Sequence, residues 1–146
     1  MSTAVNQAIL TALRGNAALT GLLATQPSGE PAIFYGHKSE TPPIYAQLTF
    51  EEETIGPTPG FWPGWLNKDE YYNIAIWTNQ RGSGIIDSIH LEVARTLHQV
   101  QLALPDPATN YMYWMRWAAG GKSSMYDHTL KAWFGLYRYR AWTAGI

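Results

Sequence analysis

Two stretches near the C-terminal end of this chain carry bulky side chains on both faces of the β-strands that they predict. Successive side chains point to opposite sides of a strand, so residues two apart share a face. Along Tyr111–Trp117, one face takes Tyr111, Tyr113, Met115 and Trp117, and the other takes Met112 and Trp114. Along Thr129–Trp142, the pattern sets Leu130, Ala132, Phe134 and Leu136 against Trp133, Tyr137 and Tyr139. Both stretches therefore predict strands with two apolar faces.

Such a sheet needs a cover on each side, and two predicted helices are too few to provide both. Antiparallel sheets in monomers usually keep one face polar. Exposed apolar patches above roughly a few hundred Å² usually mark interaction surfaces. A partner surface is therefore the economical cover for the second face. The alternative is that the chain's own long loop at 51–70 folds back over it.

Helical periodicity predicts two main helices and one short helical turn. The first helix covers residues 3–14, and Asn16 can cap the short turn at 17–24. The second helix starts at a Ser83 cap and runs to about Gln99. Its apolar stripe consists of Ile85, Ile89, Val93, Leu97 and Val100.

Alternating and β-rich stretches predict the strands, which are Ile33–Tyr35, Ile44–Phe50, Tyr71–Trp77, Tyr111–Trp117 and Thr129–Trp142. A turn at Gly120–Ser124 is expected between the last two. Few helices and mostly hairpin-linked strands predict the α+β class. We expect a single domain over residues 1–146, with an antiparallel or mixed sheet of about 4–5 strands and two helices packed on one face.

The composition also indicates a surface that something covers. Charged residues make up 14% of the chain, against the roughly 25% usual for globular domains, and aromatic residues make up another 14%. The formal net charge of −1 gives no reason to expect tight binding to DNA. Residues 1–73 hold three basic and seven acidic side chains, a net of −4, and residues 74–146 hold seven and four, a net of +3. This split favours complementary surfaces for self-association.

Several function classes lack their signatures here. The chain has no cysteine, and it lacks phosphate-loop, nucleotide-binding and hydrolase motifs. Its first residues lack the basic and apolar regions of a signal peptide, and it has no apolar stretch of membrane-spanning length, so we expect a protein assembled in a cytoplasm, with no membrane partner.

No catalytic, metal or cofactor site is expected either. His90 and His98 lie eight residues apart, too far for a metal pair on one helix face. Ser123, Ser124, Asp127 and His128 are adjacent in sequence, whereas catalytic triads usually recruit residues from separate elements. We interpret them as a polar turn, and we predict that the protein is not an enzyme.

The segment 51–70 is unusual because it combines loop-forming and aromatic residues. Its three prolines and three glycines predict a long loop and not a continuous strand. Phe61, Trp62 and Trp65 are anchors that a disordered linker would not be expected to carry. One alternative function is a carbohydrate-binding module, with Trp62, Trp65 or Trp133 as its stacking platform.

Four stretches, in order along nearly the whole chain, resemble the tail-completion or tail-terminator proteins of long-tailed bacteriophages. Leu13–Ala24 is similar to their short helix, and Ile33–Leu48 to their strand, glycine loop and second strand. Tyr71–His98 resembles their strand ending in Trp followed by a long amphipathic helix, and Leu136–Trp142 resembles their closing strand. The segments 51–70 and 111–117 depart from that pattern.

This resemblance implies a virion structural protein of the tail or neck. Such proteins form a ring, typically a hexamer, at the head-proximal end of the tail tube. The ring ends tail assembly and joins the tail to the head-side connector, while DNA passes through its lumen without sequence-specific binding. The expected partners are other copies of the chain, the tail tube protein and the connector protein. A head-closure or other neck protein is the alternative role.

Together these arguments assign two contact surfaces. The second sheet face, centred on Trp77, Trp133 and Tyr137, is expected to contact neighbouring subunits. Arg138 and Arg140 are the candidate partners of a neighbour's acidic stretch, which consists of Glu51, Glu52 and Glu53. The loop carrying Phe61, Trp62 and Trp65 is expected to dock on the tail tube or the connector.

Overall fold

The computed structural model describes residues 2–26, 28–35, 46–59, 64–79, 84–128 and 131–145, except for the side chains at 2–3, 46–48, 51–59 and 120–124. Within these residues the helices are α1 (Ser2–Arg14), α2 (Ala17–Leu22) and α3 (Gly84–Leu97). The strands are β1 (Ile33–Tyr35), β2 (Ala46–Pro59), β3 (Leu66–Thr78), β4 (Asn110–Asp127) and β5 (Ala132–Gly145).

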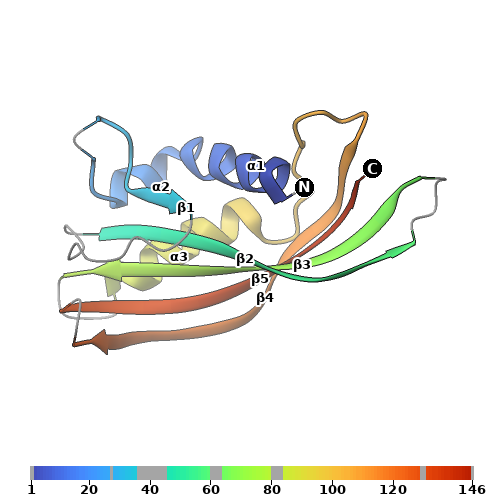
Figure 1. Ribbon diagram of the computed structural model, residues 1–146. Coiled ribbons are helices and arrows are strands. Elements are labelled where there is room, and N and C mark those ends of the chain that lie inside the picture. The colour runs from blue at the N-terminus through green and yellow to red at the C-terminus, as the bar shows by residue number, and fades with distance from the viewer. Residues whose placement is uncertain are drawn as a thin grey trace.

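The described strands form one sheet in the order β1-β2-β3-β5-β4. β1 runs parallel to β2, and the other neighbours are antiparallel. All three helices lie on the same side of this sheet (Figure 1). The predicted α+β class with a mixed sheet is confirmed.

Alternation in β3 creates the core on the helix side. Every second residue of β3 from Glu70 to Thr78 is buried, and Tyr72, Ile74 and Ile76 are fully so. Helix α3 packs its own buried stripe against them, which consists of Ile86, Ile89, His90, Val93 and Leu97. The predicted stripe is confirmed at Ile89, Val93 and Leu97, whereas Ile85 is only half-buried and Ile86 takes its place. Val100 lies beyond the end of α3, where it forms a bridge with Met115.

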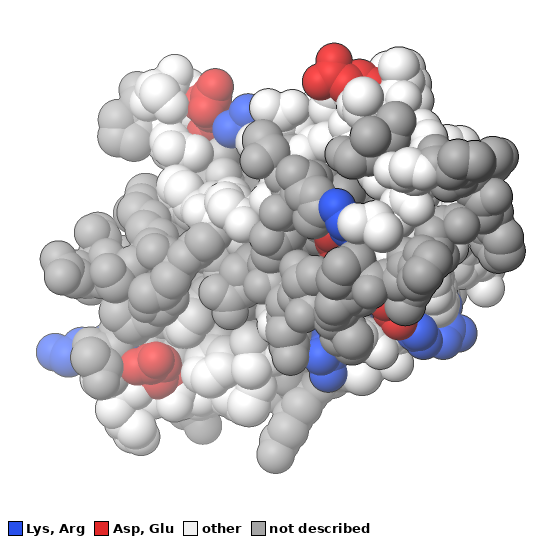
Figure 2. Space-filling view, turned by 45° about the vertical axis from the view of Figure 1, so that its right-hand side comes forward, with Lys and Arg blue, Asp and Glu red and all other residues white. Residues whose placement is uncertain are grey.

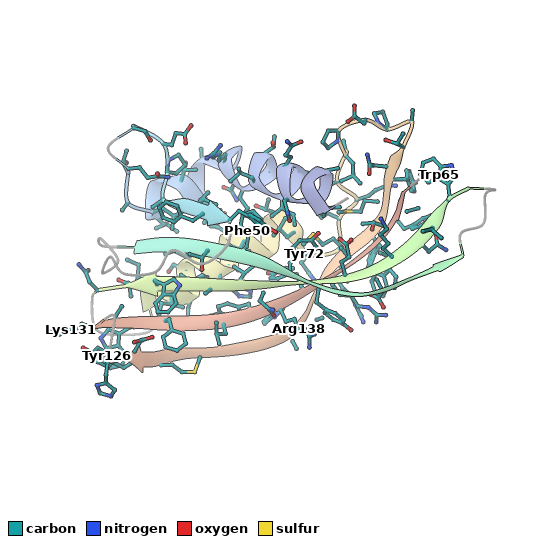
Figure 3. All side chains as sticks on the ribbon, in the orientation of Figure 1. Phe50, Trp65, Tyr72, Tyr126, Lys131 and Arg138 are labelled. Carbon is teal, nitrogen blue, oxygen red and sulfur yellow. The ribbon has the colours of Figure 1, made fainter. Side chains whose placement is uncertain are left out.

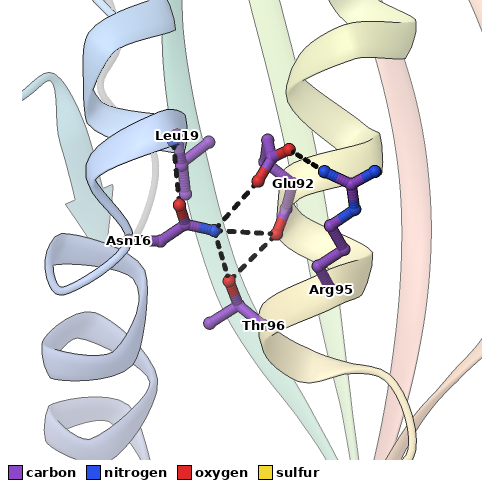
Figure 4. A network of polar contacts seen from close by, with 5 residues as sticks. All are labelled: Asn16, Leu19, Glu92, Arg95 and Thr96. Atoms are coloured by element: carbon purple, nitrogen blue, oxygen red, sulfur yellow. Dashed lines mark hydrogen bonds and ion pairs between the residues drawn. The ribbon is translucent and has the colours of Figure 1, made fainter.

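A polar cluster joins the helices to each other (Figure 4). Asn16 caps α2 as predicted, since its side chain accepts a hydrogen bond from the Leu19 backbone N–H at 3.1 Å. Its amide group donates to Thr96 Oγ1 at 2.9 Å and to the backbone oxygen of Glu92 at 3.3 Å. Asn16 therefore both starts α2 and fixes it to α3.

The predicted loop at 51–70 is wrong, because most of this segment belongs to two long paired strands. β2 runs to Pro59 and β3 begins at Leu66, and the register shifts between Ile55 and Thr58. Among the described residues β1 pairs only with Leu48–Phe50, so the rest of β2 has a described partner strand on one side, and Pro57 lies in the register shift, where proline is tolerated. The β2–β3 hairpin reaches beyond the helices (Figure 1).

The predicted turn at Gly120–Ser124 is also wrong. β4 continues through it to Asp127, and the chain turns instead between β4 and β5, where Lys131 has a positive φ of 52°. β4 shifts register against β5 four times, between Met112 and Met125. Such β-bulges let a strand absorb extra residues, so glycines in this stretch bend the strand without ending it.

Candidate functional site: the uncovered face of the sheet

The side of the sheet opposite the helices is the candidate site, and we call it the uncovered face. Paired residues in neighbouring strands share a face, so the register identifies its members. They are Asp69, Tyr71, Asn73, Ala75 and Trp77 of β3, Phe134, Leu136, Arg138, Arg140 and Trp142 of β5, and Trp114 and Arg116 of β4. In Figure 3, Arg138 points away from the helices, whereas Phe50 and Tyr72 lie on the helix side.

Arginine side chains in the middle of the uncovered face lie on aromatic rings. The Arg138 guanidinium carbon is 3.9 Å from the centre of the Tyr71 ring, and that of Arg140 is 4.2 Å from the Trp142 ring. Arg116 approaches Trp142 at 5.5 Å. Each such contact contributes about 0.5–1 kcal/mol at exposed sites and holds a flexible side chain flat on the sheet. The uncovered face therefore places arginine guanidinium groups directly beside the aromatic rings of Tyr71 and Trp142.

Arg140 also has an ionic partner within the chain. Its Nε donates to Asp69 Oδ1 at 2.7 Å and its Nη2 donates to Asp69 Oδ2. This hydrogen bond to Asp69 raises the pKa of Arg140. Both side chains are 28% exposed, so a neighbour's carboxylate at Arg140 would have to share the guanidinium with Asp69.

An apolar groove of about 390 Å³ lies at one end of the uncovered face, and we call it the tryptophan groove. Its walls are Asn67, Lys68, Tyr113, Trp114, Trp142 and Thr143. A register shift in β4 between Met112 and Trp114 inserts Tyr113, whose hydroxyl donates to Asn67 Oδ1 at 3.2 Å. Trp114 is 40% exposed, so the groove opens a large aromatic surface to its surroundings.

The other end of the uncovered face is aliphatic and aromatic. Trp77 stacks on Phe134 with ring centres 4.8 Å apart, and its indole N–H donates to Thr49 Oγ1 at 3.3 Å. Leu136 is 47% exposed. Trp77 therefore lies where the sequence predicted it, on a second apolar face.

The predicted position of Tyr137 on that face is wrong. Tyr137 is 3% exposed and lies on the helix side, where its ring stacks on His90 with centres 3.6 Å apart. Trp133 shares this side and packs partly against the core, so it offers no open platform for a sugar. A Cβ on Gly135 would come within 2.8 Å of Ile86 Cγ2, so close packing of α3 on Gly135 fixes which way β5 faces.

Phe134, Leu136 and Trp142 are the β5 residues of the uncovered face that sequence reasoning missed. Two signals in the sequence could have found them. A glycine inside a strand often marks the close approach of another element, which points to the face shared by Gly135 and Tyr137. Arg138 and Arg140 alternate with Tyr137 and Tyr139, and the charged set is the one expected to point away from the core.

His90 lies on the opposite, covered side of the sheet. It is 7% exposed, and its Nε2 is 3.0 Å from the Tyr139 hydroxyl. Burial lowers the pKa of His90 to about 4, although the nearby Asp87 opposes this shift. Burial also raises the pKa values of Tyr137 and Tyr139. The cluster is a packed, uncharged junction between α3 and β5.

The remaining predicted contact residues belong to the β2–β3 hairpin. In β2, Glu51, Glu52 and Glu53 pair in register with Asn73, Tyr72 and Tyr71. Phe61 and Trp62 lie outside the described residues. Trp65 is half-buried at the hairpin end, while Tyr126 and Lys131 lie at the opposite end of the sheet (Figure 3).

The residues considered for chemistry lie near the β4–β5 turn. Asp127 ends β4, and the His128 ring lies 4.9 Å from that of Tyr126. Ser123 and Ser124 are in β4, and their side chains lie outside the described part. Among the described residues, no three histidine or acidic side chains are grouped to hold a metal ion.

Charge is sparse on the face of the molecule that Figure 2 shows. Basic and acidic side chains are few and scattered in the view of Figure 2, with no large patch of one sign among the residues described there. No described helix has the length and apolar character needed to span a bilayer.

The fold and the uncovered face define an α+β protein whose described helices all lie on the same side of the sheet. This fold is shared with a solved chain described as "Virion of native gene transfer agent (GTA) particle". The TM-score is 0.72, and the match covers 99% of this chain and 97% of that chain at 17% sequence identity. No protein-family model and no curated protein matches the sequence.

Proposed function

We propose that this protein is a structural component of a phage-like virion that forms a ring at the head-proximal end of the tail tube. The ring, a hexamer in this proposal, ends tail assembly and joins the tail to the head-side connector. DNA passes through its lumen without sequence-specific binding, and the protein performs no catalysis. The motif resemblance to tail-terminator proteins motivates these finer details.

The observation that carries the proposal is the likeness to the gene transfer agent virion chain. It extends over 99% of this chain and 97% of the other, so it concerns the whole architecture and not a shared sub-motif. A head-closure or other neck protein is the alternative role.

The uncovered face supports self-association. Leu136 and Trp114 are each at least 40% exposed on it, and the tryptophan groove lies beside Trp114. Aromatic side chains and arginine are enriched at protein interfaces. Within this proposal Trp77 belongs to the subunit contact, and the acidic stretch of β2 from a neighbour meets the arginines of β5.

The β2–β3 hairpin end is the proposed docking element for the tail tube or the connector. Its residues 60–65 connect two strands that reach beyond the helices (Figure 1), and the sequence there is FWPGW from Phe61 to Trp65. Aromatic anchors of this kind often dominate the energy of a protein interface.

The test of function uses purified full-length protein and polymerising tail tube protein from the same particle. Native mass spectrometry and negative-stain images should show closed rings with a central opening. Added rings should cap one end of each tube and stop its growth. A variant lacking residues 60–63 should still form rings but should no longer cap tubes.

Two results would contradict this function. Tubes that continue to grow from both ends in the presence of intact rings would exclude the terminator role. Rings that bind only isolated connector and never tubes would favour the head-closure role instead.

A further inference from the structure

Two histidines at α3 contact the same tryptophan of β4, and we call this contact of His90, His98 and Trp117 the Trp117 junction. His90 lies within α3, and its ring packs on the Trp117 ring with the ring centres 4.5 Å apart. His98 directly follows the last residue of α3, and its Nδ1 accepts a hydrogen bond from the Trp117 backbone N–H at 3.0 Å. The two histidines therefore hold the side chain and the backbone of Trp117 against the helix.

The hydrogen bond at His98 requires a neutral imidazole ring. A neutral ring has one nitrogen that accepts a hydrogen bond, whereas the protonated ring carries N–H groups on both nitrogens and only donates. Protonation of His98 therefore replaces this bond with two N–H groups that face each other. Histidine is the side chain that ordinarily gains its charge between about pH 5 and 8, and His98 is partly exposed to solvent protons.

His90 remains neutral because other rings cover it. It is 7% exposed, with the Tyr137 ring stacked on it and the Trp117 ring packed against it at a steep interplanar angle of 70°. Burial lowers the pKa of His90 to about 4. Because Trp117 is part of this cover, its displacement gives His90 access to water and returns the pKa of His90 toward the ordinary value.

The surrounding charged and titratable groups do not reverse the effect of burial. On the elements that pack around the two histidine rings, the described groups of this kind are Asp87, Glu92 and Arg95 of α3, and Tyr137 and Tyr139 of β5. Asp87 favours protonation of His90, but burial has the larger influence. Arg95 is paired with Glu92 at 2.6 Å, and β4 contributes the uncharged side chains of Met115 and Trp117 on this side of the sheet. Burial and the hydrogen bond to His98 therefore maintain the neutral state of the junction.

We propose that the Trp117 junction is an acid-sensitive switch, in which protonation of His98 and His90 releases Trp117 from α3. His98 takes up the first proton because it is the more exposed of the two rings. Loss of its hydrogen bond frees Trp117, which uncovers His90 and favours binding of the second proton. The two protons therefore bind in one cooperative transition. This switch concerns a single chain and is independent of the proposed ring.

The release is local, because a separate contact holds the neighbouring part of β4. Val100 and Met115 form an antiparallel bridge, with backbone hydrogen bonds of 3.1 and 2.8 Å between them. These groups do not titrate, so the bridge persists in acid. Trp117 lies two residues further along β4, next to the stretch 118–127, whose outer side has no described partner strand. Acid is therefore expected to free this edge of the sheet from Trp117 onward, while the start of β4 stays attached.

Hydrogen exchange measured by NMR on the full-length protein tests the switch. The protection factor of the Trp117 backbone amide, corrected for the intrinsic pH dependence of exchange, should fall at least about tenfold from about pH 7.5 to about pH 5. The Val93 amide within α3 should keep its protection, which would show that the helix stays folded. The ring signals of His90 and His98, followed in the same titration, should change together with a Hill coefficient above about 1.

Two substitutions of His98 separate the switch from a general effect of acid. His98→Asn keeps a side-chain oxygen that accepts a hydrogen bond but does not titrate, so Trp117 should retain its protection at about pH 5. His98→Lys has no acceptor, so Trp117 should already lack this protection at about pH 7.5. His128→Asn is the matched control and should behave like wild type, because His128 follows the end of β4 and contacts Tyr126. Circular dichroism melting curves verify that each variant folds.

Unchanged Trp117 protection at about pH 5 in folded wild-type protein would overturn the proposal, as would a loss in His98→Asn equal to that in wild type. Loss of protection at Trp117 and Val93 together would show general unfolding and would also contradict it. Independent titration of the two histidine rings would exclude the coupling between them. A local loss that His98→Asn prevents, and that His98→Lys produces at neutral pH, supports the switch.

Discussion

The two faces of the same sheet differ in how their aromatic side chains are used. On the helix side, Tyr72 and Tyr139 are fully buried, and the Tyr139 hydroxyl is hydrogen-bonded to His90 Nε2. On the uncovered face, Trp114 and Leu136 remain 40% and 47% exposed, and arginines lie on Tyr71 and Trp142. The first face stabilises the monomer. The second face, in the proposed ring, contacts a neighbouring subunit.

The largest expected effect comes from a charge on the covered face. Ile89→Asp should abolish the cooperative thermal transition at neutral pH, because Ile89 is fully buried and an unpaired buried charge costs several kcal/mol. Leu91→Asp is the matched control on the same helix, since Leu91 is 51% exposed, and it should melt close to wild type. Equal melting temperatures for the two variants would mean that α3 does not pack as described.

A smaller effect should follow from adding one methyl group between α3 and β5. Gly135→Ala would place its Cβ 2.8 Å from Ile86 Cγ2, and we expect a loss of about 1–3 kcal/mol of unfolding free energy in urea titrations. Gly21→Ala in α2 is the control, because nothing lies within 4 Å and alanine favours helix. In a double-mutant cycle, Gly135→Ala should cost less unfolding free energy in an Ile86→Ala background than in wild type if the clash is its cause.

The pH dependence of stability tests the buried histidine. The folded-state pKa of His90 is about 4, below the ordinary 6.5, so the folded state binds fewer protons between these values. Stability is then complete above pH 6.5 and declines as the pH falls toward 4, by on the order of 1–3 kcal/mol. His90→Gln should flatten this decline in urea titrations across the same window. An unchanged slope in His90→Gln would show that other groups cause it.

The smallest effect on stability is expected on the uncovered face. Leu136→Ser should change the unfolding free energy by no more than about 0.5 kcal/mol, because half-exposed surface substitutions rarely do more. It should nevertheless weaken self-association measured by sedimentation. A large loss of stability with unchanged association would reverse the roles assigned to the two faces.

Much of the covered face could be predicted from the sequence, because local patterns determine it. The period of Ile89, Val93 and Leu97 identifies a helix and its buried side. The side-chain chemistry of Asn16 alone predicts that this residue caps α2. These features depend on residues close together in the chain.

The uncovered face was harder to predict because it depends on pairing between distant segments. The prolines of β2 are tolerated where no described strand pairs with its outer side and where its register against β3 shifts, and no local pattern shows either feature. Which side chains of β5 point toward the helices depends on the packing of Ile86 against Gly135, and these two residues are 49 positions apart in the sequence. With both strand faces rich in aromatic side chains, the alternation alone did not determine which one pointed inward.

The central claim is that the uncovered face is buried between subunits, and thiol accessibility tests it most directly. The chain has no cysteine, so Leu136→Cys and Leu91→Cys each introduce a single thiol at a position of similar exposure, 47% and 51%. In dilute monomers both thiols should react with a maleimide at similar rates. In assembled protein, we predict strong protection of the Leu136→Cys thiol and continued reaction of the Leu91→Cys thiol. Equal reactivity of both thiols in verified assemblies would contradict the account.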